Sequence, residues 1–182
     1  EAVKMLSNLA GMQPYTFSKQ DEERENKWKL YKSICNNFSE FYKNELFKNK
    51  NSINAKNYLK ARGLSGVEVN NFNIGFVTED LDYYEKLNKD FDEEIIKDTG
   101  LFYFDEKRKK YISRFRNRII FPINNISGNV IGFGGRIIDD NKNLAKYINS
   151  PETPFFKKGS NLYNLDKARK LSNKLEDVYL VE

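Results

Sequence analysis

The sequence predicts an α+β fold in which N-terminal helices are followed by a mainly antiparallel, basic β-sheet subdomain. Helical spacings of apolar residues dominate residues 1–100, whereas residues 101–165 contain β-forming runs separated by turn residues. The charge follows a similar division. Residues 107–158 contain twelve Lys and Arg against three Asp and Glu, a net charge of +9, while the remaining residues have a net charge of −4. Such segregation is typical of nucleic-acid binders, although a merely solvated basic face would also produce it.

The N-terminal part is predicted to consist of helices. A short helix over residues 1–10 ends at Gly11, and a linker over 14–20 leads to a long helix over 21–48, whose acidic first turn suits the helix dipole. Ser residues can cap the next two helices, and Gly63 can end the first of them. Further helices are expected over residues 52–62, 65–72, 81–87 and 92–97, with a short strand or packed loop over 74–77.

The long helix has an aromatic stripe that we interpret as core. Its members recur at spacings of three and four: Trp28, Tyr31, Cys35, Phe38 and Tyr42, widened by Leu30, Ile34, Phe41 and Leu46. Cys35 is the only cysteine, which excludes an internal disulfide and a multi-cysteine zinc site, and we expect it to be a small core residue. The chain has no histidine, so any chemistry must use carboxylates, Lys, Arg or a metal held by oxygen ligands.

The C-terminal part is predicted to contain strands joined by turns. A polar, basic turn between two apolar runs suggests a hairpin, and the residues from Asn124 to Gly128 have the composition of a second turn. Strands are expected over residues 101–104, 111–112, 118–123, 130–138 and 178–181, with a helix over 166–171. Glu182 ends the last of these strands.

The glycines of Gly132-Phe-Gly-Gly135 do not form a nucleotide loop. The dinucleotide fingerprint needs a third Gly at position 137 and a helix after it, but Ile137 stands there and the strand pattern continues. No phosphate-loop sequence of the Walker type is present. We interpret the glycines as places where a backbone approaches closely or the sheet bends, with Arg136 presented beside them.

Several basic residues are candidates for contact with phosphates. Arg114, Arg116 and Arg118 alternate, so an extended strand would direct all three to one face, where a phosphate backbone could bridge them. The alternative is that carboxylates of the acidic half pair with them. In the proline-bounded stretch that follows, Lys146 and Lys158 could meet phosphates and Tyr147 could stack on a base.

Several stretches of this sequence, in order and with family-like spacing, resemble bacterial DnaG-type DNA primases. The resemblance is to the N-terminal, basic subdomain of the RNA-polymerase core, up to the first strand of the Toprim fold. The matching stretches are Tyr58-Leu-Lys-Ala-Arg-Gly63-Leu, Asn73-Ile-Gly-Phe76, Arg114-Phe-Arg-Asn-Arg118-Ile-Ile-Phe-Pro-Ile123, Val130-Ile-Gly-Phe-Gly-Gly-Arg136, Lys146-Tyr-Ile-Asn-Ser-Pro-Glu-Thr-Pro154 and Val178-Tyr-Leu-Val-Glu182. The first residues, Glu1 to Gly11, resemble the tail that follows the N-terminal zinc domain in this family.

The resemblance implies an enzyme that synthesises short RNA primers on single-stranded DNA during replication. The implied partners are the DNA template, ribonucleoside triphosphates, the primer–template hybrid and, through a missing C-terminal region, the replicative helicase. The resemblance implies roles in holding template and nucleotide for Arg62, Arg136, Lys146, Tyr147 and Lys158. Glu182 matches the Toprim glutamate, which implies acid/base or metal work with Mg²⁺ or Mn²⁺ in two-metal nucleotidyl transfer. A Zn²⁺ site is implied only for a missing N-terminal domain.

These expectations give a division of the chain and three functional hypotheses. Residues 1–20 would be the tail of the zinc-domain connection, 21–176 the core subdomain, and 177–182 the start of the Toprim domain. The core subdomain would be helical over 21–100, β-rich over 101–165 and helical again over 166–172. Our first hypothesis is a cytoplasmic primase fragment, with no membrane contact, that binds nucleic acid but does not polymerise alone. The alternatives are a non-catalytic single-stranded nucleic-acid-binding module, and a structural domain whose basic strand pairs with its own acidic helices.

Overall fold

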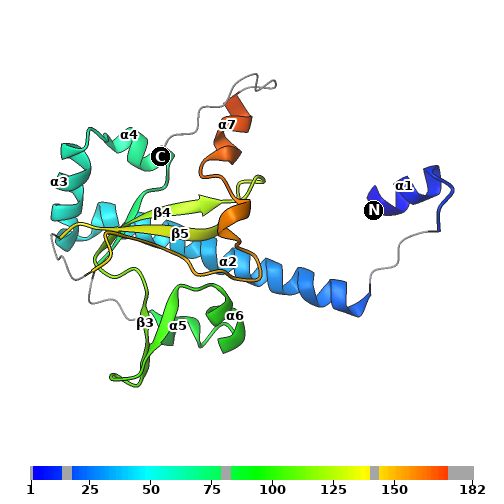
Figure 1. The fold of residues 1–182 in the computed structure, drawn as a ribbon, viewed down its shortest axis with the longest axis horizontal. Coiled ribbons are helices and arrows are strands. Elements are labelled where there is room, and N and C mark those ends of the chain that lie inside the picture. The colour runs from blue at the N-terminus through cyan, green and yellow to red at the C-terminus, as the bar shows by residue number, and fades with distance from the viewer. Residues whose placement is uncertain (1, 14–17, 79–82, 140–143, 172–182) are drawn as a thin grey trace.

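A computed structural model describes residues 2–13, 18–78, 83–139 and 144–171. It confirms the predicted α+β class: helices come first along the chain and antiparallel strands follow (Figure 1). The predicted strand over 178–181, Glu182 and most of the linker over 14–20 lie outside the described residues. Among the described residues, no helix combines the length and the apolar character that crossing a bilayer would need.

The strands form one four-stranded sheet and one separate hairpin. In the sheet the order is β1-β4-β5-β6, and all neighbours are antiparallel. The strands are β1 (Gly75–Val77), β4 (Arg118–Asn124), β5 (Val130–Ile137) and β6 (Tyr147–Asn149), and the hairpin is formed by β2 (Phe102–Asp105) and β3 (Lys110–Ser113). The apolar run after residue 73 is therefore a strand. Strand β6 was missed: it lies in the proline-bounded stretch that was interpreted as a loop, and it is only three residues long and polar at two of them.

The helices begin and end close to the predicted positions. They are α1 (Ala2–Leu9), α2 (Lys19–Lys48), α3 (Ile53–Ala61), α4 (Gly66–Asn71), α5 (Tyr84–Leu87), α6 (Glu93–Asp98) and α7 (Leu165–Leu171), with 3-10 turns η1 (Lys50–Ser52) and η2 (Lys158–Ser160). Helix α2 begins earlier than expected because Ser18 caps it: the Ser18 hydroxyl accepts from the backbone of Asp21, and the Asp21 carboxylate accepts from the backbone of Ser18.

One face of the sheet packs against α2, which runs behind β4 and β5 in Figure 1. The aromatic stripe of α2 is core, as predicted: Tyr31, Ile34, Cys35, Phe38, Tyr42 and Leu46 are buried. The stripe is narrower than expected at its N-terminal end, where Leu30 is 43% exposed. Helix α2 lies very close to β1 at Gly75. A Cβ at this position would lie only 2.5 Å from the carbonyl carbon of Tyr42, so the close approach requires glycine.

A second apolar cluster fixes α3 and α4 beside the sheet. Leu59 of α3 and Val69 of α4 are buried against Phe76 of β1 and Ile119 of β4. Figure 1 shows the two helices next to the same end of the sheet. Because these apolar side chains anchor α3 there, the end of α3 lies next to the first residues of β4 and the last residues of β5.

Candidate nucleic-acid interface

The sheet face that points away from α2 carries the candidate site. Antiparallel register places Phe121 opposite Gly134 and Gly134 opposite Asn149. One row further, Arg136 lies opposite Tyr147. Because side chains alternate along a strand, these residues share one face.

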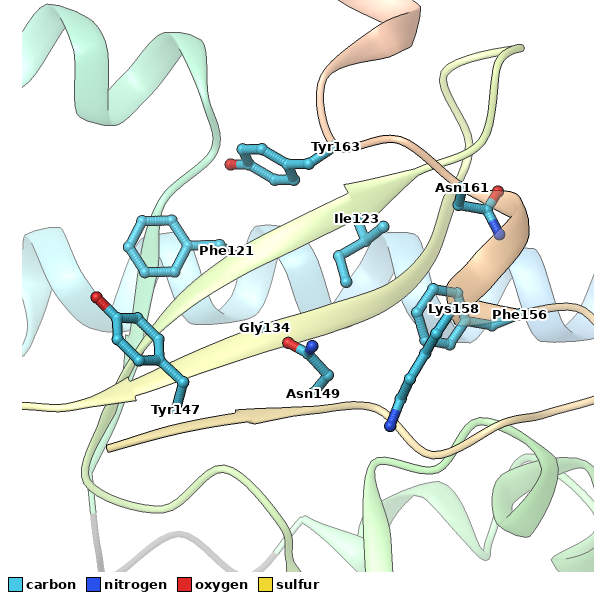
Figure 2. Close-up of a pocket in the computed structure, with 9 residues that line it drawn as sticks. All are labelled: Phe121, Ile123, Gly134, Tyr147, Asn149, Phe156, Lys158, Asn161 and Tyr163. Atoms are coloured by element: carbon cyan, nitrogen blue, oxygen red, sulfur yellow. The ribbon is translucent and has the colours of Figure 1, made fainter. Parts of the chain in front are cut away.

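A groove of about 410 Å³ lies on this face. Figure 2 shows aromatic rings at both ends, with Gly134 and Asn149 between them. Its lining residues are Phe121, Ile123, Gly134, Tyr147, Asn149, Phe156, Lys158, Asn161 and Tyr163. The groove is therefore mainly apolar and aromatic, with two amides and one ammonium group at its edges.

The glycines of β5 allow close packing, as the sequence predicted. A Cβ on Gly134 would lie 3.2 Å from Asn149 Oδ1, inside the groove. On the α2 side, a Cβ on Gly135 would lie 2.7 Å from the ring of Phe115. A Cβ on Gly132 would lie 3.3 Å from the ring of Phe156. A side chain at any of these positions would force a neighbour to move, so glycine is favoured on packing grounds.

Arg136 is held between two tyrosine rings. Its guanidinium carbon lies 5.1 Å from the ring centroid of Tyr58 and 4.9 Å from that of Tyr147. Arg136 Nη1 also donates a hydrogen bond to the Tyr147 hydroxyl. Arg136 Nε is buried and has no hydrogen-bond partner among the described residues. Cation–π contacts and one hydrogen bond thus orient this side chain.

Arg62 reaches the same place from α3. It follows the last residue of the helix, and Gly63, with a φ of +78°, terminates it. The guanidinium carbon of Arg62 lies 5.3 Å from the ring centroid of Tyr58, the ring that also contacts Arg136. The structure therefore brings Arg62, Arg136 and Tyr147 together, although the sequence separates the first two by more than seventy positions.

The two candidate lysines differ in their placement. Lys158 lies in η2 and lines the groove, and its backbone N–H donates to the carboxylate of Glu152 over 3.0 Å. Lys146 is exposed beside Tyr147 but is not among the residues that line the groove. Its carbonyl accepts hydrogen bonds from the Ile137 N–H and the Arg118 guanidinium.

The three alternating arginines do not form the predicted row. Arg114 and Arg116 lie in the turn between β3 and β4, where Asn117 has a φ of +54°, so only Arg118 belongs to a strand. The prediction of one common face was wrong because alternation holds only in extended backbone. The opposite parity predicts that Phe115, Ile119 and Phe121 face the core. Phe115 and Ile119 are fully buried, but the prediction was wrong for Phe121, which is only partly buried and lines the groove.

Each of the three arginines has different surroundings. Arg114 Nε donates to the Gly100 carbonyl over 2.9 Å, and burial lowers the pKa of its guanidinium. Arg118 is buried, and its Nη1 donates to the carbonyls of Gly135 and Lys146 over 3.4 Å and 3.3 Å. Arg116 lies near Asp105, whose pKa is lowered first by the Arg108 N–H and also by the positive charge of Arg116. Arg114 and Arg118 are thus tied to main-chain carbonyls.

The cations around the groove lack acidic partners. No carboxylate of the described residues lies within 4.0 Å of the side-chain nitrogens of Arg62, Arg136, Lys146 or Lys158. The ion pairs that do occur among the described residues lie on α2, α6 and the β2–β3 hairpin. The hypothesis that acidic helices pair with the basic strand finds no support in these contacts. An anion is the natural ligand for such a cluster.

The described residues do not provide a metal centre. They bring together no group of three or more Asp, Glu or Cys side chains that could hold an ion. Glu182, the candidate catalytic and metal-binding residue, lies outside the described residues. The oxygen and sulfur ligands of the described residues therefore do not fit a two-metal site.

Sequence reasoning missed part of the groove. Tyr58, Phe121, Asn149, Phe156 and Tyr163 were not singled out as site residues, although four of them line the groove and Tyr58 contacts two candidate arginines. Strand parity puts Phe121 on one face with Ile119 and Ile123, but parity cannot tell that this face is buried at Ile119 and open at Phe121. No local signal could have paired Tyr58 with Arg136, because their contact depends on how α3 packs beside β5.

Comparison with known proteins agrees with this geometry. A family model described as "DNA primase catalytic core, N-terminal domain" matches residues 41–169. This chain belongs to that family. The match covers α3 to α6, the first part of α7, the sheet and every described candidate residue of the groove.

Curated relatives of this primase-core domain are much longer than the chain. It is 37% identical to a DNA primase of Pseudomonas putida over 100% of its own length, and 38% identical to one of Lactococcus lactis over the same share. The chain spans 28% of the length of each of these relatives. Among solved structures it resembles a DnaG primase catalytic domain bound to ssDNA, with a TM-score of 0.73 and 32% identity over 82% of this chain and 46% of that one. A DNA primase domain from Pseudomonas aeruginosa gives a TM-score of 0.68 and 38% identity over 79% of this chain and 44% of that one.

Proposed function

We propose that this primase-core domain supplies the template- and nucleotide-binding surface of a DNA primase. In the complete enzyme, that surface would hold single-stranded DNA and incoming ribonucleotides while short RNA primers are made. Two observations together carry the proposal: Lys158 lines an aromatic groove, and Arg62 and Arg136 meet at Tyr58 beside the groove residue Tyr147. None of these three cations has a carboxylate partner among the described residues. Phosphates would lie along the cations, and a base would enter the groove.

The groove has the chemistry that a single strand requires. Bases stack on aromatic rings with little sequence preference, and Phe121, Tyr147 and Tyr163 offer such rings. Asn149 and Asn161 can donate to and accept from base edges. The likeness to a DnaG catalytic domain described as bound to ssDNA supports this choice of ligand. Arg116 and Lys146 lie just before β4 and β6 in the sequence and do not line the groove. In our proposal they would add to the positive electrostatic potential around it.

The chemical step would depend on parts of the enzyme beyond this surface. In our proposal Mg²⁺ or Mn²⁺ would assist nucleotidyl transfer at carboxylates of a Toprim domain, with Glu182 as one of them, and Zn²⁺ would belong to a separate domain. The replicative helicase would dock elsewhere, and the enzyme would work in the bacterial cytoplasm. The purified 182-residue chain would therefore bind nucleic acid without making primers.

Fluorescence anisotropy of a labelled single-stranded DNA of mixed sequence tests the proposal. The chain would be compared with the triple variant Arg62→Gln, Arg136→Gln, Lys158→Gln. Affinity falls as salt rises, so the slope of log affinity against log salt concentration is negative. Removing three phosphate contacts should make this slope less steep by about 2 between roughly 50 mM and 200 mM salt. A matched control, Arg24→Gln, Lys29→Gln, Lys48→Gln, removes three exposed cations of α2 and should keep nearly the original slope.

The outcomes separate this proposal from the structural alternative. Salt-sensitive binding that is lost only in the groove variant supports it. No binding, or equal losses in the two triple variants, would contradict it, because the charge would then have no specific place. A metal-dependent primer product from the purified chain would contradict the claim that catalysis needs further parts.

A further inference from the structure

Tyr58 joins two cations that come from different elements. It lies on α3, and its ring centroid is 5.3 Å from the guanidinium carbon of Arg62 and 5.1 Å from that of Arg136. Arg136 comes from β5. One aromatic ring thus contacts both guanidinium groups, and Arg136 is oriented by Tyr147 as well. No carboxylate of the described residues pairs with either group.

The ring of Tyr58 is itself held in place. It is partly buried and packs against the second apolar cluster, which includes Leu59 and Ile119. Its hydroxyl is buried and has no hydrogen-bond partner among the described residues. The hydroxyl therefore contributes no hydrogen bond to the arrangement, and the face of the ring is the part that acts on the two arginines.

Holding the arginines in advance has an energetic consequence. A free arginine side chain loses rotational freedom when it binds a phosphate, and this loss weakens binding. A phosphate can accept charge-assisted hydrogen bonds from guanidinium groups. A ring that orders both groups before the ligand arrives lowers this entropic cost and so favours binding of the anion.

We propose that Tyr58 is a positioning residue for single-stranded nucleic acid, acting through Arg62 and Arg136 rather than by touching the strand. This inference rests on the proposed function and adds one residue to it. It assigns the effect to the aromatic ring, so phenylalanine should replace tyrosine and an aliphatic side chain should not.

The test combines variants that remove the Tyr58 ring with a background in which Arg62 and Arg136 are replaced. Tyr58→Met and Tyr58→Leu keep apolar packing but lack a π face, whereas Tyr58→Phe keeps the ring. Each is made in the 182-residue chain with Arg62 and Arg136 intact and in the Arg62→Gln, Arg136→Gln background, and binding of labelled single-stranded DNA is measured by anisotropy. Phe47→Leu is the control, because Phe47 is a half-exposed aromatic residue at the end of α2 with no cation over its ring among the described contacts. Circular dichroism checks that each variant is folded.

We expect Tyr58→Met and Tyr58→Leu to weaken binding by about threefold to tenfold, and Tyr58→Phe and Phe47→Leu to change it by less than about twofold. In the Arg62→Gln, Arg136→Gln background, removal of the ring should no longer affect binding, because the two guanidinium groups that the ring contacts are absent. Unchanged binding in folded Tyr58→Met, or the same loss in both backgrounds, would overturn the inference while leaving the proposed function intact. If the Arg62→Gln, Arg136→Gln variant binds single-stranded DNA as tightly as the original chain, the proposed function fails and the inference fails with it.

Discussion

The guanidinium carbon of Arg136 lies 4.9 Å from the ring centroid of Tyr147, and Arg136 Nη1 donates a hydrogen bond to the hydroxyl of that ring. The two residues are direct neighbours across β5 and β6. Tyr147 is still 56% exposed, so its ring can meet a ligand while it orients the arginine. This pair therefore joins a phosphate-binding cation to a surface on which a base can stack.

Replacing the Tyr147 ring with an aliphatic side chain should weaken DNA binding more than removing its hydroxyl group. Tyr147→Leu loses both the stacking surface and the contact with Arg136, and we expect a cost of about 1–3 kcal/mol in binding of single-stranded DNA. Tyr147→Phe keeps the ring and should cost less than about 1 kcal/mol. Anisotropy titrations at one salt concentration would measure both. Equal affinities for the two variants would show that the ring does not meet the strand.

Filling the groove should block it without unfolding the domain. Gly134 lies in β5 with an ordinary backbone conformation, so valine is compatible with the strand. Its side chain would enter the space next to Asn149 Oδ1, and we expect Gly134→Val to weaken DNA binding by at least about tenfold by excluding a base worth about 1–3 kcal/mol. The thermal midpoint should change little. Full binding by a folded Gly134→Val chain would place the strand outside the groove.

Arg118 should matter for stability and not for DNA. It is buried, and its guanidinium donates to the carbonyls of Gly135 and Lys146. Arg118→Ala leaves those carbonyls with fewer partners and opens a space, so we expect a loss of about 1–3 kcal/mol in the free energy of unfolding. Urea denaturation measures the loss. Arg62→Gln is the matched comparison, because Arg62 is exposed and should show the opposite pattern of lost affinity and retained stability.

Tyr31 should stabilise the junction between α2 and the sheet. Its hydroxyl donates to the Ile131 carbonyl over 2.6 Å and lies 3.3 Å from Thr153 Oγ1. Tyr31→Phe removes one buried hydrogen bond and should lower the free energy of unfolding by about 1 kcal/mol with an unchanged denaturant slope. Ser33→Ala on the exposed side of the same helix is the control. A stability equal to that of the original chain would mean that the bond adds nothing net.

The single thiol should be unreactive while the domain is folded. Cys35 is fully buried in α2, and burial raises the pKa of its thiol to about 12. At neutral pH almost no thiolate is present, and the thiolate is the reactive form. A thiol reagent should therefore modify Cys35 only at the rate at which the protein unfolds, and quickly in denaturant. Rapid labelling under native conditions would contradict the buried position.

The sequence by itself determined the α+β class, most element boundaries and the core stripe of α2, because these follow from local periodicity and capping. Ser65 and Gly63 act within one turn of their own positions, so their effects were predicted. The cap at Ser18 was missed, and Ser52, which was predicted to cap α3, makes no side-chain capping hydrogen bond there. The basic segment over residues 107–158 and the close packing at Gly135 could also be predicted from residue type and spacing. The resemblance, not periodicity, supplied Arg62 as a site residue.

Only the tertiary structure decided which cations share a ligand. Arg114 and Arg118 look like phosphate-binding residues in the sequence, yet a turn at Asn117 directs them to main-chain carbonyls. Arg62 and Arg136 are far apart along the chain, yet both lie on the ring of Tyr58. The physical reason is that local patterns fix backbone conformation over a few residues, whereas contacts between α3 and β5 depend on how the apolar cluster beneath them packs.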